Sequence, residues 1–231
     1  IDGLFSRIDK IPVTEVWMMD PAEDRLAITA GLCRRMAEAH GNPFSVHATT
    51  DMRAAVKDAK YVVTQLRVGG IQARIQDEKL GFRHGIVGQE TTGIGGFAKA
   101  LRTIPRILDI ARAMEESAAK DAVLVNFTNP SGIVTEAVIR HSKVDGVGLC
   151  NIPVGMIMEL VDKFGYKMEE VQLDYVGLNH LAWVRGVTAG GKDVWKEALQ
   201  HFVDNAEEEW KYPDVAENLR LVMKSLNMAL N

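Results

Sequence analysis

The sequence has little that would suit a secreted, membrane-bound or nucleic-acid-binding protein. Among its 231 residues there are only two cysteines, Cys33 and Cys150, so a disulfide framework is not expected and a reducing, cytoplasmic setting is favoured. No apolar run reaches the roughly 18 residues that a membrane-spanning helix needs. A formal net charge of −4 offers no basic surface for nucleic acid or for an anionic membrane. We therefore expect neither of these partners.

The residues that are present suit a globular protein. Hydrophobic residues make up 47% of the chain, enough to fill the core of one large domain or two small ones. The chain has no initiator Met, and Ile1 stands in what reads as the middle of an amphipathic helix without the basic flank of a signal peptide. An apolar helical pattern from Leu219 to Met228 has no stop signal. We expect an interior piece of a longer protein.

Short apolar runs alternate with helical patterns as far as about residue 165. The runs predict strands at 13–19, 45–48, 60–66, 122–127 and 144–149. The patterns between and after them predict helices at 24–40, 51–58, 71–80, 97–114, 131–141 and 153–164. Such alternation is typical of right-handed βαβ units, so we predict an α/β fold with a doubly wound parallel, Rossmann-like sheet that lacks its first strand here.

The pattern changes near residue 170. Strand-like runs at 171–178 and 181–187, a Gly190-Gly191 turn and a short run at 193–195 predict antiparallel strands. We therefore predict two domains. The first is an N-terminally truncated dinucleotide-binding domain, 1–169, and the second is the start of an α+β catalytic domain, 170–231, truncated at its C-terminus.

Two residues suited to a metal follow strand-like runs. Cys150 follows the run at 144–149, and His180 follows the run at 171–178. Strand ends are where open α/β sheets bind ligands. A thiolate and an imidazole suit a borderline divalent metal, and two protein ligands leave coordination positions open for catalysis. The alternative is a buried cysteine that packs as a small hydrophobe and a histidine bonded to a backbone carbonyl.

Other polar residues are candidates for binding phosphate or a nucleotide. Asp20 closes the first strand, where a carboxylate in a dinucleotide-binding sheet hydrogen-bonds the ribose, although a helix cap is the alternative. The glycine fingerprint would lie about 20 residues earlier, before this chain begins. Arg67 and Arg74 are two helical turns apart and could share a face that binds phosphate, or be solvated surface arginines.

Five short motifs together resemble one family, the NAD- and metal-dependent family 4 glycoside hydrolases. They occur in the order and spacing of that family over nearly the whole chain, and their pattern is closest to the 6-phospho-β-glucosidase branch. The motifs are Arg67-Val68-Gly69-Gly70, Gly85-Ile86-Val87-Gly88-Gln89-Glu90-Thr91, Asn126-Phe127-Thr128-Asn129-Pro130, Gly148-Leu149-Cys150-Asn151-Ile152-Pro153 and Gly177-Leu178-Asn179-His180.

The resemblance implies a glycosidase that cleaves 6-phospho-β-glucosides, with a phosphorylated disaccharide such as cellobiose 6-phosphate as substrate. It implies NAD and Mn²⁺, or another divalent metal, as cofactors. The reaction it implies begins with NAD-mediated oxidation at C3 of the sugar and metal-assisted deprotonation at C2, and continues with elimination, water addition and re-reduction. This route is a known exception to the two-carboxylate mechanism of most glycosidases. It also implies a homo-oligomer, a dimer or a tetramer.

The resemblance assigns roles to individual residues as well. The metal ligands are Cys150 and His180. The substrate-binding residues are Arg74 at the 6-phosphate, Asn129, Asn151 and Asn179. The cofactor-binding residues are Asp20 at the ribose, Arg67, Asn126 and Asn129. Glu90 supports a catalytic tyrosine that is expected beyond residue 231. Asn151 stands where α-specific members carry an Asp that is thought to donate a proton, so the asparagine favours β-linked substrates.

Three alternatives stay open. A sibling specificity would make the protein a 6-phospho-α-glucosidase or an α-galactosidase. A 2-hydroxy-acid dehydrogenase shares the doubly wound sheet but needs no metal, and NADH would accumulate with turnover. An NAD-binding sensor or scaffold would bind the dinucleotide without a metal affinity that depends on Cys150.

Overall fold

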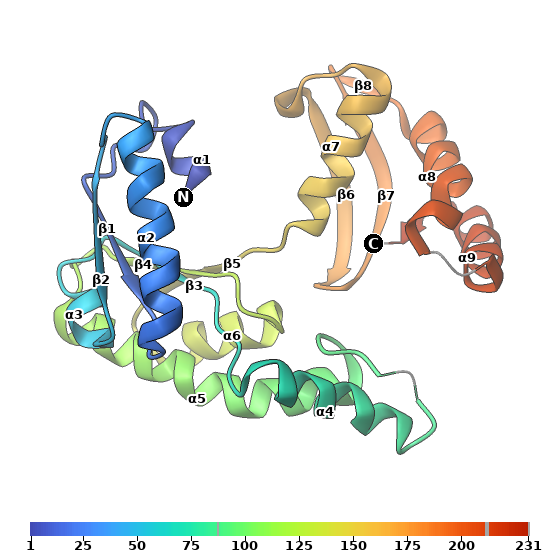
Figure 1. Cartoon of the computed structure of the whole chain (residues 1–231). Helices are drawn as coiled ribbons and strands as arrows, with labels where there is room; N and C mark the ends of the chain where they lie inside the picture. The colour runs from blue at the N-terminus through green and yellow to red at the C-terminus, as the bar shows by residue number, and fades with distance from the viewer. Residues whose placement is uncertain (87, 211–212, 231) are drawn as a thin grey trace. The chain divides into compact units, whose positions relative to one another are not determined.

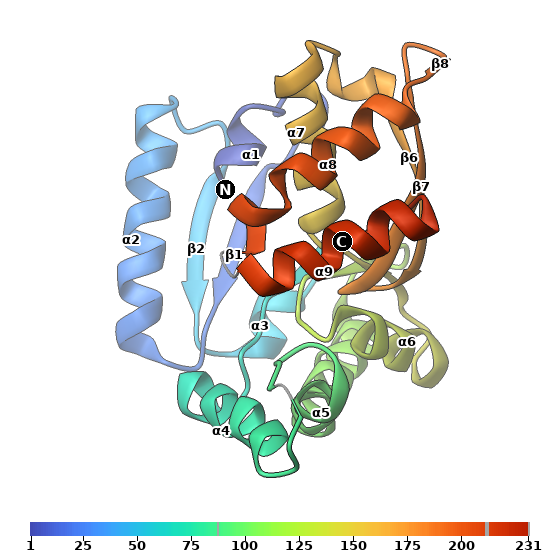
Figure 2. The ribbon, with the colours of Figure 1, turned by 90° about the vertical axis from the view of Figure 1, so that its right-hand side faces the viewer.

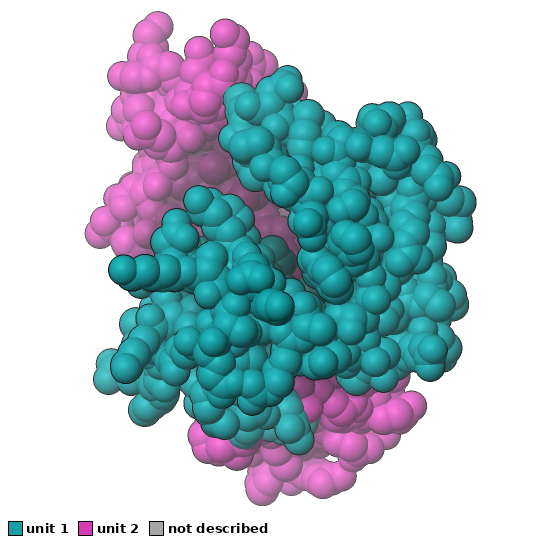
Figure 3. Space-filling model, turned by 90° about the vertical axis from the view of Figure 1, so that its left-hand side faces the viewer, with its two compact units in different colours: residues 1–66, 102–126, 134–147 teal, residues 67–101, 127–133, 148–231 magenta. Residues whose placement is uncertain are grey.

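Figure 1 shows the computed structural model of the chain, which describes residues 1–86, 88–210 and 213–230. The chain folds into two compact units, coloured separately in Figure 3. Unit 1 comprises residues 1–66, 102–126 and 134–147, and unit 2 comprises residues 67–101, 127–133 and 148–231. The domain division at residues 169 and 170 stays a prediction.

Unit 1 is an α/β structure with parallel strands, as the alternating pattern predicts. Its strands are β1 (Glu15–Met19), β2 (Ser45–Thr49), β3 (Tyr61–Thr64), β4 (Val123–Asn126) and β5 (Asp145–Gly148). The first two strands pair in parallel, as do β3 and β4, and β5 lies next to β4. Its helices are α1 (Asp2–Phe5), α2 (Glu23–Ala39), α3 (Met52–Val56) and the larger parts of α5 (Gly93–Ser117) and α6 (Ser131–His141).

Helices and strands of unit 1 meet in apolar cores. Helix α2 covers one face of the β1–β2 pair (Figures 1 and 2). The apolar stripe of α5, represented by Ile107, Ala111 and Met114, is buried in one core together with Leu124 of β4, as a helical period of 3.6 residues requires. At the start of α3, Asp51 accepts a hydrogen bond from the Arg53 backbone N–H at 2.9 Å, so this aspartate is the N-cap of the helix.

Unit 2 contains the antiparallel region and the helices around it. Its helices are α4 (Gly70–Phe82), α7 (Ile152–Phe164), the short 3₁₀ helix η1 (Met168–Glu170), α8 (Trp195–Trp210) and α9 (Pro213–Leu226). Its strands are β6 (Val171–Leu178), β7 (Leu181–Ala189), β8 (Lys192–Asp193) and β9 (Ala229–Leu230). Strand β7 pairs antiparallel with β6, β8 and β9, which confirms the predicted antiparallel strands.

Several predicted boundaries differ from the structure by a few residues, and the starts of α8 and α5 are two examples. The run at 193–195 is not all strand, because Trp195 begins α8, where its backbone N–H donates to the carboxylate of Asp193 at 2.8 Å. Helix α5 begins at Gly93, whereas the sequence predicts a start near Phe97. At the start of α8 a side-chain hydrogen bond, and not the hydrophobic pattern, decides where the helix begins.

Candidate functional site

The tip of the β6–β7 hairpin carries His180. Leu178 and Leu181 face each other in the register, so the turn consists of Asn179 and His180 alone. His180 has a φ of +62°, a left-handed conformation that is uncommon for a residue with a side chain and that clusters at functional sites. Gly177 has a φ of +121°, and a Cβ there would lie 2.6 Å from the Leu181 carbonyl oxygen. The hairpin therefore holds the histidine in a conformation that its backbone does not prefer.

Cys150 meets this histidine. It lies between β5 and α7, and its Sγ is 3.7 Å from Nε2 of His180. Metal–sulfur and metal–nitrogen bonds of about 2.3 and 2.0 Å at a tetrahedral angle would place the two donor atoms about 3.5 Å apart. The observed separation therefore suits a shared divalent ion. Within the described residues no group of three or more His, Cys, Asp and Glu side chains could hold a metal, so the candidate ligands that this part of the chain brings together are a pair.

The surroundings of the pair change its acid–base properties. Burial lowers the pKa of His180, and the nearby Lys99 lowers it further while Glu90 opposes this. A neutral imidazole is the form that binds a metal. Burial also raises the pKa of the Tyr175 phenol, and the charge of Cys150 adds to that effect. Tyr175 is therefore held as a neutral phenol beside the cysteine.

The predicted asparagines of unit 2 lie around the same hairpin. The Asn179 side chain donates to Oδ1 of Asn129 at 3.3 Å, which ties the turn to the segment before α6. Oδ1 of Asn129 also accepts from the Ser131 backbone N–H. Asn151 is the N-cap residue of α7, but its side chain makes no capping hydrogen bond. Its exposed amide is therefore not used in holding the helix.

Glu90 is the centre of a charged cluster in the same unit. One of its oxygens, Oε2, lies 2.7 Å from Arg67, 3.0 Å from Lys99 and 3.5 Å from Arg74. Burial alone would raise the pKa of Glu90, but the hydrogen bonds from Lys99 and Arg67 outweigh it and the pKa lies below its ordinary value. Arg74 also bonds Glu78 one turn along α4. The structure thus places the two predicted phosphate-binding arginines around one carboxylate.

Lys99 is the member of this cluster that sequence reasoning missed. Its side chain is only 5% exposed although it carries a charge. A lysine among the apolar residues at the start of a helical pattern is the one indication that the sequence offered, because buried lysines almost always have an anionic partner.

Three glycines allow the loop that carries Glu90 to fold tightly. A Cβ at Gly88 would overlap the carbonyl group of Glu78, and one at Gly95 would overlap the carbonyl oxygen of Gln89. Gly96 is in the same situation against Thr91. The glycines thus have a packing role at this loop.

The remaining predicted cofactor residues belong to unit 1. The Asp20 carboxylate accepts two hydrogen bonds from Arg25, at 2.7 and 2.8 Å, and one from the Ala22 backbone. The bond from Arg25 is the main reason why the pKa of Asp20 is lowered. Asn126 is fully buried, with its amide bonded to Thr64 and Thr135. Their roles toward a cofactor stay predictions.

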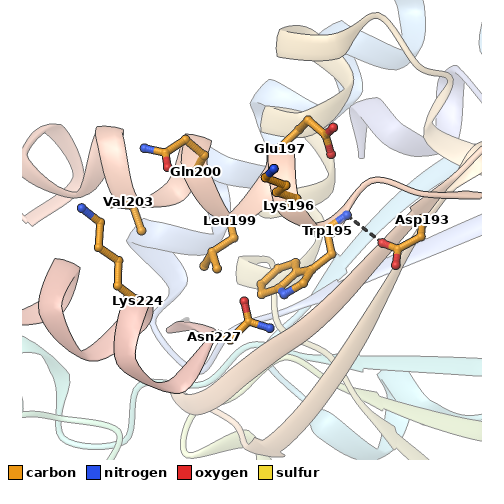
Figure 4. Close-up of a pocket in the computed structure, with 9 residues that line it drawn as sticks. All are labelled: Asp193, Trp195, Lys196, Glu197, Leu199, Gln200, Val203, Lys224 and Asn227. Atoms are coloured by element: carbon orange, nitrogen blue, oxygen red, sulfur yellow. Dashed lines mark hydrogen bonds between the residues drawn. The ribbon is translucent and has the colours of Figure 1, made fainter.

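A cavity of about 520 Å³ in unit 2 contains none of the predicted site residues. Figure 4 shows the polar and apolar side chains of α8, α9 and the end of β8 that line it. The indole N–H of Trp195, one of these residues, is buried and has no acceptor among the described residues. Since the Cys150–His180 pair and the Glu90 cluster lie outside this cavity, it is not the candidate site.

Comparison with known proteins decides the family. A model described as "Family 4 glycosyl hydrolase" matches residues 1–166. The chain belongs to this family. The resemblance read from the five motifs is therefore confirmed.

Relatives of this family 4 chain have related names. It is 42% identical over 207 residues to "Probable 6-phospho-beta-glucosidase" of Bacillus subtilis (strain 168), covering 88% of the chain and 47% of that protein. It is 43% identical over 203 residues to "6-phospho-beta-glucosidase" of Escherichia coli (strain K12), covering 86% of the chain and 45% of that protein. The chain thus spans about half the length of these relatives.

A solved structure shares the fold of this family 4 chain. It is the 6-phospho-beta glucosidase of Thermotoga maritima with manganese, NAD⁺ and glucose-6-phosphate, with a TM-score of 0.88 and 32% identity. The match covers 100% of this chain and 53% of that one. The predicted α/β, Rossmann-like fold with a following antiparallel region is therefore confirmed.

Proposed function

We propose that the protein carrying this chain is an NAD- and divalent-metal-dependent 6-phospho-β-glucosidase, and that Cys150 and His180 are its metal ligands. The observation that carries the proposal is the 3.7 Å separation of Sγ and Nε2 in a family 4 chain, beside a carboxylate held by three cations. The names of the relatives and the manganese, NAD⁺ and glucose-6-phosphate of the Thermotoga structure support it.

The donor set suits the proposed metal. A thiolate and a neutral imidazole leave most coordination positions for oxygen atoms of the substrate, which is the arrangement of a catalytic rather than a structural site. When bound, NAD⁺ and the metal supply a hydride acceptor and a Lewis acid for an oxidation–elimination route. The catalytic base of that route is proposed to be a tyrosine outside this chain.

Other residues of the chain would bind and orient the substrate. Arg74 is proposed to bind the 6-phosphate, because its guanidinium is 39% exposed and phosphate matches its geometry. Asn129 and Asn179 would bond sugar hydroxyls from the hairpin and the segment joined to it, and the amide of Asn151 would do the same. Asp20, Arg67, Asn126 and Asn129 are proposed for the NAD side of the site.

Glu90 is proposed as a positioning residue with a fixed negative charge. Its bonds to Arg67 and Lys99 keep it ionised, so that it neither takes nor gives a proton near neutral pH. In this role it supports the basicity of the tyrosine through charge, and it balances the cations that surround the phosphate.

Family membership favours this function over a 2-hydroxy-acid dehydrogenase or a sensor. The asparagine at position 151 favours β-linked over α-linked substrates. A phosphorylated disaccharide substrate, a homo-oligomeric state, a cytoplasmic location and the absence of nucleic-acid and membrane partners belong to the same proposal. None of the described helices combines the length and hydropathy needed to cross a bilayer.

The test is hydrolysis of p-nitrophenyl β-glucoside 6-phosphate by the intact protein that carries this chain, with NAD⁺ and Mn²⁺ under reducing conditions. We expect release of nitrophenol that needs both NAD⁺ and the metal, stops with a chelator and slows when the sugar carries deuterium at C2. Release that ignores NAD⁺ and chelator would overturn the proposal. Activity on the α-linked phosphoglucoside alone would instead show that the protein is a 6-phospho-α-glucosidase.

A further inference from the structure

Arg74, the residue proposed for the 6-phosphate, is held by carboxylates through one of its nitrogens. Its Nε donates a hydrogen bond to Oε1 of Glu78 at 2.8 Å and lies 3.5 Å from Oε2 of Glu90. Its two terminal nitrogens donate no hydrogen bond to any residue that the structure describes. A guanidinium is a planar fork, and the edge formed by the two terminal nitrogens matches two oxygens of a phosphate. The carboxylates therefore leave that edge available to a ligand.

Glu78 is itself fixed in place by the fold around it. It lies on α4, one turn after Arg74, and a Cβ at Gly88 would overlap its backbone carbonyl group. The loop that carries Glu90 thus packs directly against the backbone of Glu78. A carboxylate on such a rigid support can hold a guanidinium in one orientation.

A salt bridge that only stabilises a helix is the alternative, and a second pair in the chain shows how such a bridge differs. On α6, Arg140 Nε lies 2.7 Å from Glu136 Oε1, which is the same contact. The glutamate comes first there, the favourable order for a pair four residues apart. On α4 the order is reversed, so that pair adds less to its helix. Its arginine and glutamate side chains are 39% and 35% exposed, against 70% and 59% on α6.

From this geometry we infer that Glu78 is a positioning residue for the 6-phosphate, because it holds Arg74 by Nε and so aims the two terminal nitrogens at the phosphate. The inference rests on the proposed function and adds a residue to its phosphate site. An arginine side chain loses rotamer freedom when it binds a ligand, and one that is already held loses less. Holding Nε requires an acceptor oxygen but not a negative charge.

The affinity for glucose 6-phosphate tests the inference. The intact protein is loaded with Mn²⁺ and NADH, which has no capacity to accept a hydride, and is titrated with glucose 6-phosphate in a calorimeter. Glu78→Met removes the acceptor and should weaken binding by about three- to tenfold, the cost of ordering one long side chain. Glu78→Gln keeps an acceptor oxygen and should stay within about twofold of the parent. Both variants should keep the Mn²⁺ and NADH affinities of the parent, which a distorted loop would lower.

Two further comparisons show whether Glu78 acts through Arg74. Arg74→Met alone should weaken the binding of glucose 6-phosphate, and adding Glu78→Met to it should cause no further loss. Glu136→Met is the matched control, since it breaks the same contact on α6 of the other unit. It should leave the affinity for glucose 6-phosphate unchanged.

The outcomes separate the inference from the proposed function. If Arg74→Met binds weakly but Glu78→Met binds like the parent, or if Glu78→Gln loses as much as Glu78→Met, the inference is overturned and the proposed function stands. If Arg74→Met binds like the parent, or the parent binds no glucose 6-phosphate, both are overturned. A lower Mn²⁺ affinity in Glu78→Met would assign the glutamate to the support of the loop and also overturn the inference.

Discussion

The ammonium group of Lys99 lies 3.0 Å from Oε2 of Glu90, and the two side chains are only 5% and 14% exposed. Each charge is therefore held away from water by a partner of opposite sign. Removing one partner from such a pair costs far more than removing one from a pair at the surface, because the remaining charge stays desolvated.

The first prediction concerns this pair. Lys99→Met should lower the free energy of unfolding by about 2–3 kcal/mol, less than for an isolated buried pair because two arginines stay with Glu90. Urea denaturation measures the loss. The control is Lys60→Met, since the Lys60–Asp121 pair is 3.6 Å apart and largely exposed. Its loss should be below about 1 kcal/mol. Equal losses in the two variants would contradict the argument.

The second prediction concerns acid. The pKa of Glu90 in the folded protein lies below its ordinary value of 4.5, so its ionised form contributes stability that is fully present above that value. The contribution is lost as the pH falls through the lower, folded value. The stability of the parent minus that of Glu90→Gln should therefore be constant near neutral pH and shrink below about pH 4.5. Denaturation curves at a series of pH values give this difference in stability. A difference that grows on acidification would contradict the prediction.

The third prediction separates the two cysteines. Cys150→Ser should weaken Mn²⁺ binding by at least about tenfold, because a thiolate ligand is replaced by a neutral hydroxyl. Cys33→Ser should leave the affinity unchanged, since Cys33 is half-buried in α2 of unit 1. Isothermal titration with the metal alone measures both. Similar Mn²⁺ affinities in the two variants would show that Cys150 is not a metal ligand.

The fourth prediction concerns two glycines of unit 2. Gly177→Ala should destabilise the protein by about 1–3 kcal/mol, because alanine is strained at this φ and its Cβ would meet the Leu181 carbonyl. It should also weaken metal binding, because His180 would move with the turn. Gly155→Ala, within α7 and facing open space, should instead stabilise by up to about 1 kcal/mol. Thermal and urea denaturation compare the two, and a Gly177→Ala variant of unchanged stability would refute the strain argument.

The fifth prediction tests the proposed ribose contact. Asp20→Ala should weaken NAD⁺ binding by about tenfold or more if its carboxylate exchanges the bonds from Arg25 for sugar hydroxyls. Asp24→Ala is the neighbouring control, an exposed carboxylate in the first turn of α2. Fluorescence titration with NADH reports both affinities. If the two variants bind equally well, the carboxylate serves only the start of the helix.

Much of the fold was predictable because hydrophobic periodicity depends on local residues. The strand at 171–178 has the predicted bounds, and the helix predicted at 24–40 is observed at Glu23–Ala39. The start of α8 is an exception, because there one contact decides, the hydrogen bond between Asp193 and Trp195. A single side-chain hydrogen bond leaves no periodic trace in a sequence.

The site was predictable to a different extent. The motifs indicated Cys150 and His180, and the structure brings them together. Nothing in the spacing of Arg67, Glu90 and Lys99 showed that they would meet, because their contact depends on how α4 and α5 pack on the loop between them. From the sequence the arginines were either phosphate-binding or solvated surface residues, whereas in the structure both have a carboxylate partner.

The turn of Asn179 and His180 also limits how this region can vary in length. In a hairpin whose partners are fixed residue by residue, one inserted or deleted residue moves every following side chain to the opposite face. Such a change would carry Leu181 and the buried Val184 of β7 to the wrong sides of the ribbon and turn the imidazole away from Cys150. Natural variants of this protein should therefore differ in side chains along the hairpin far more readily than in the number of residues at its tip.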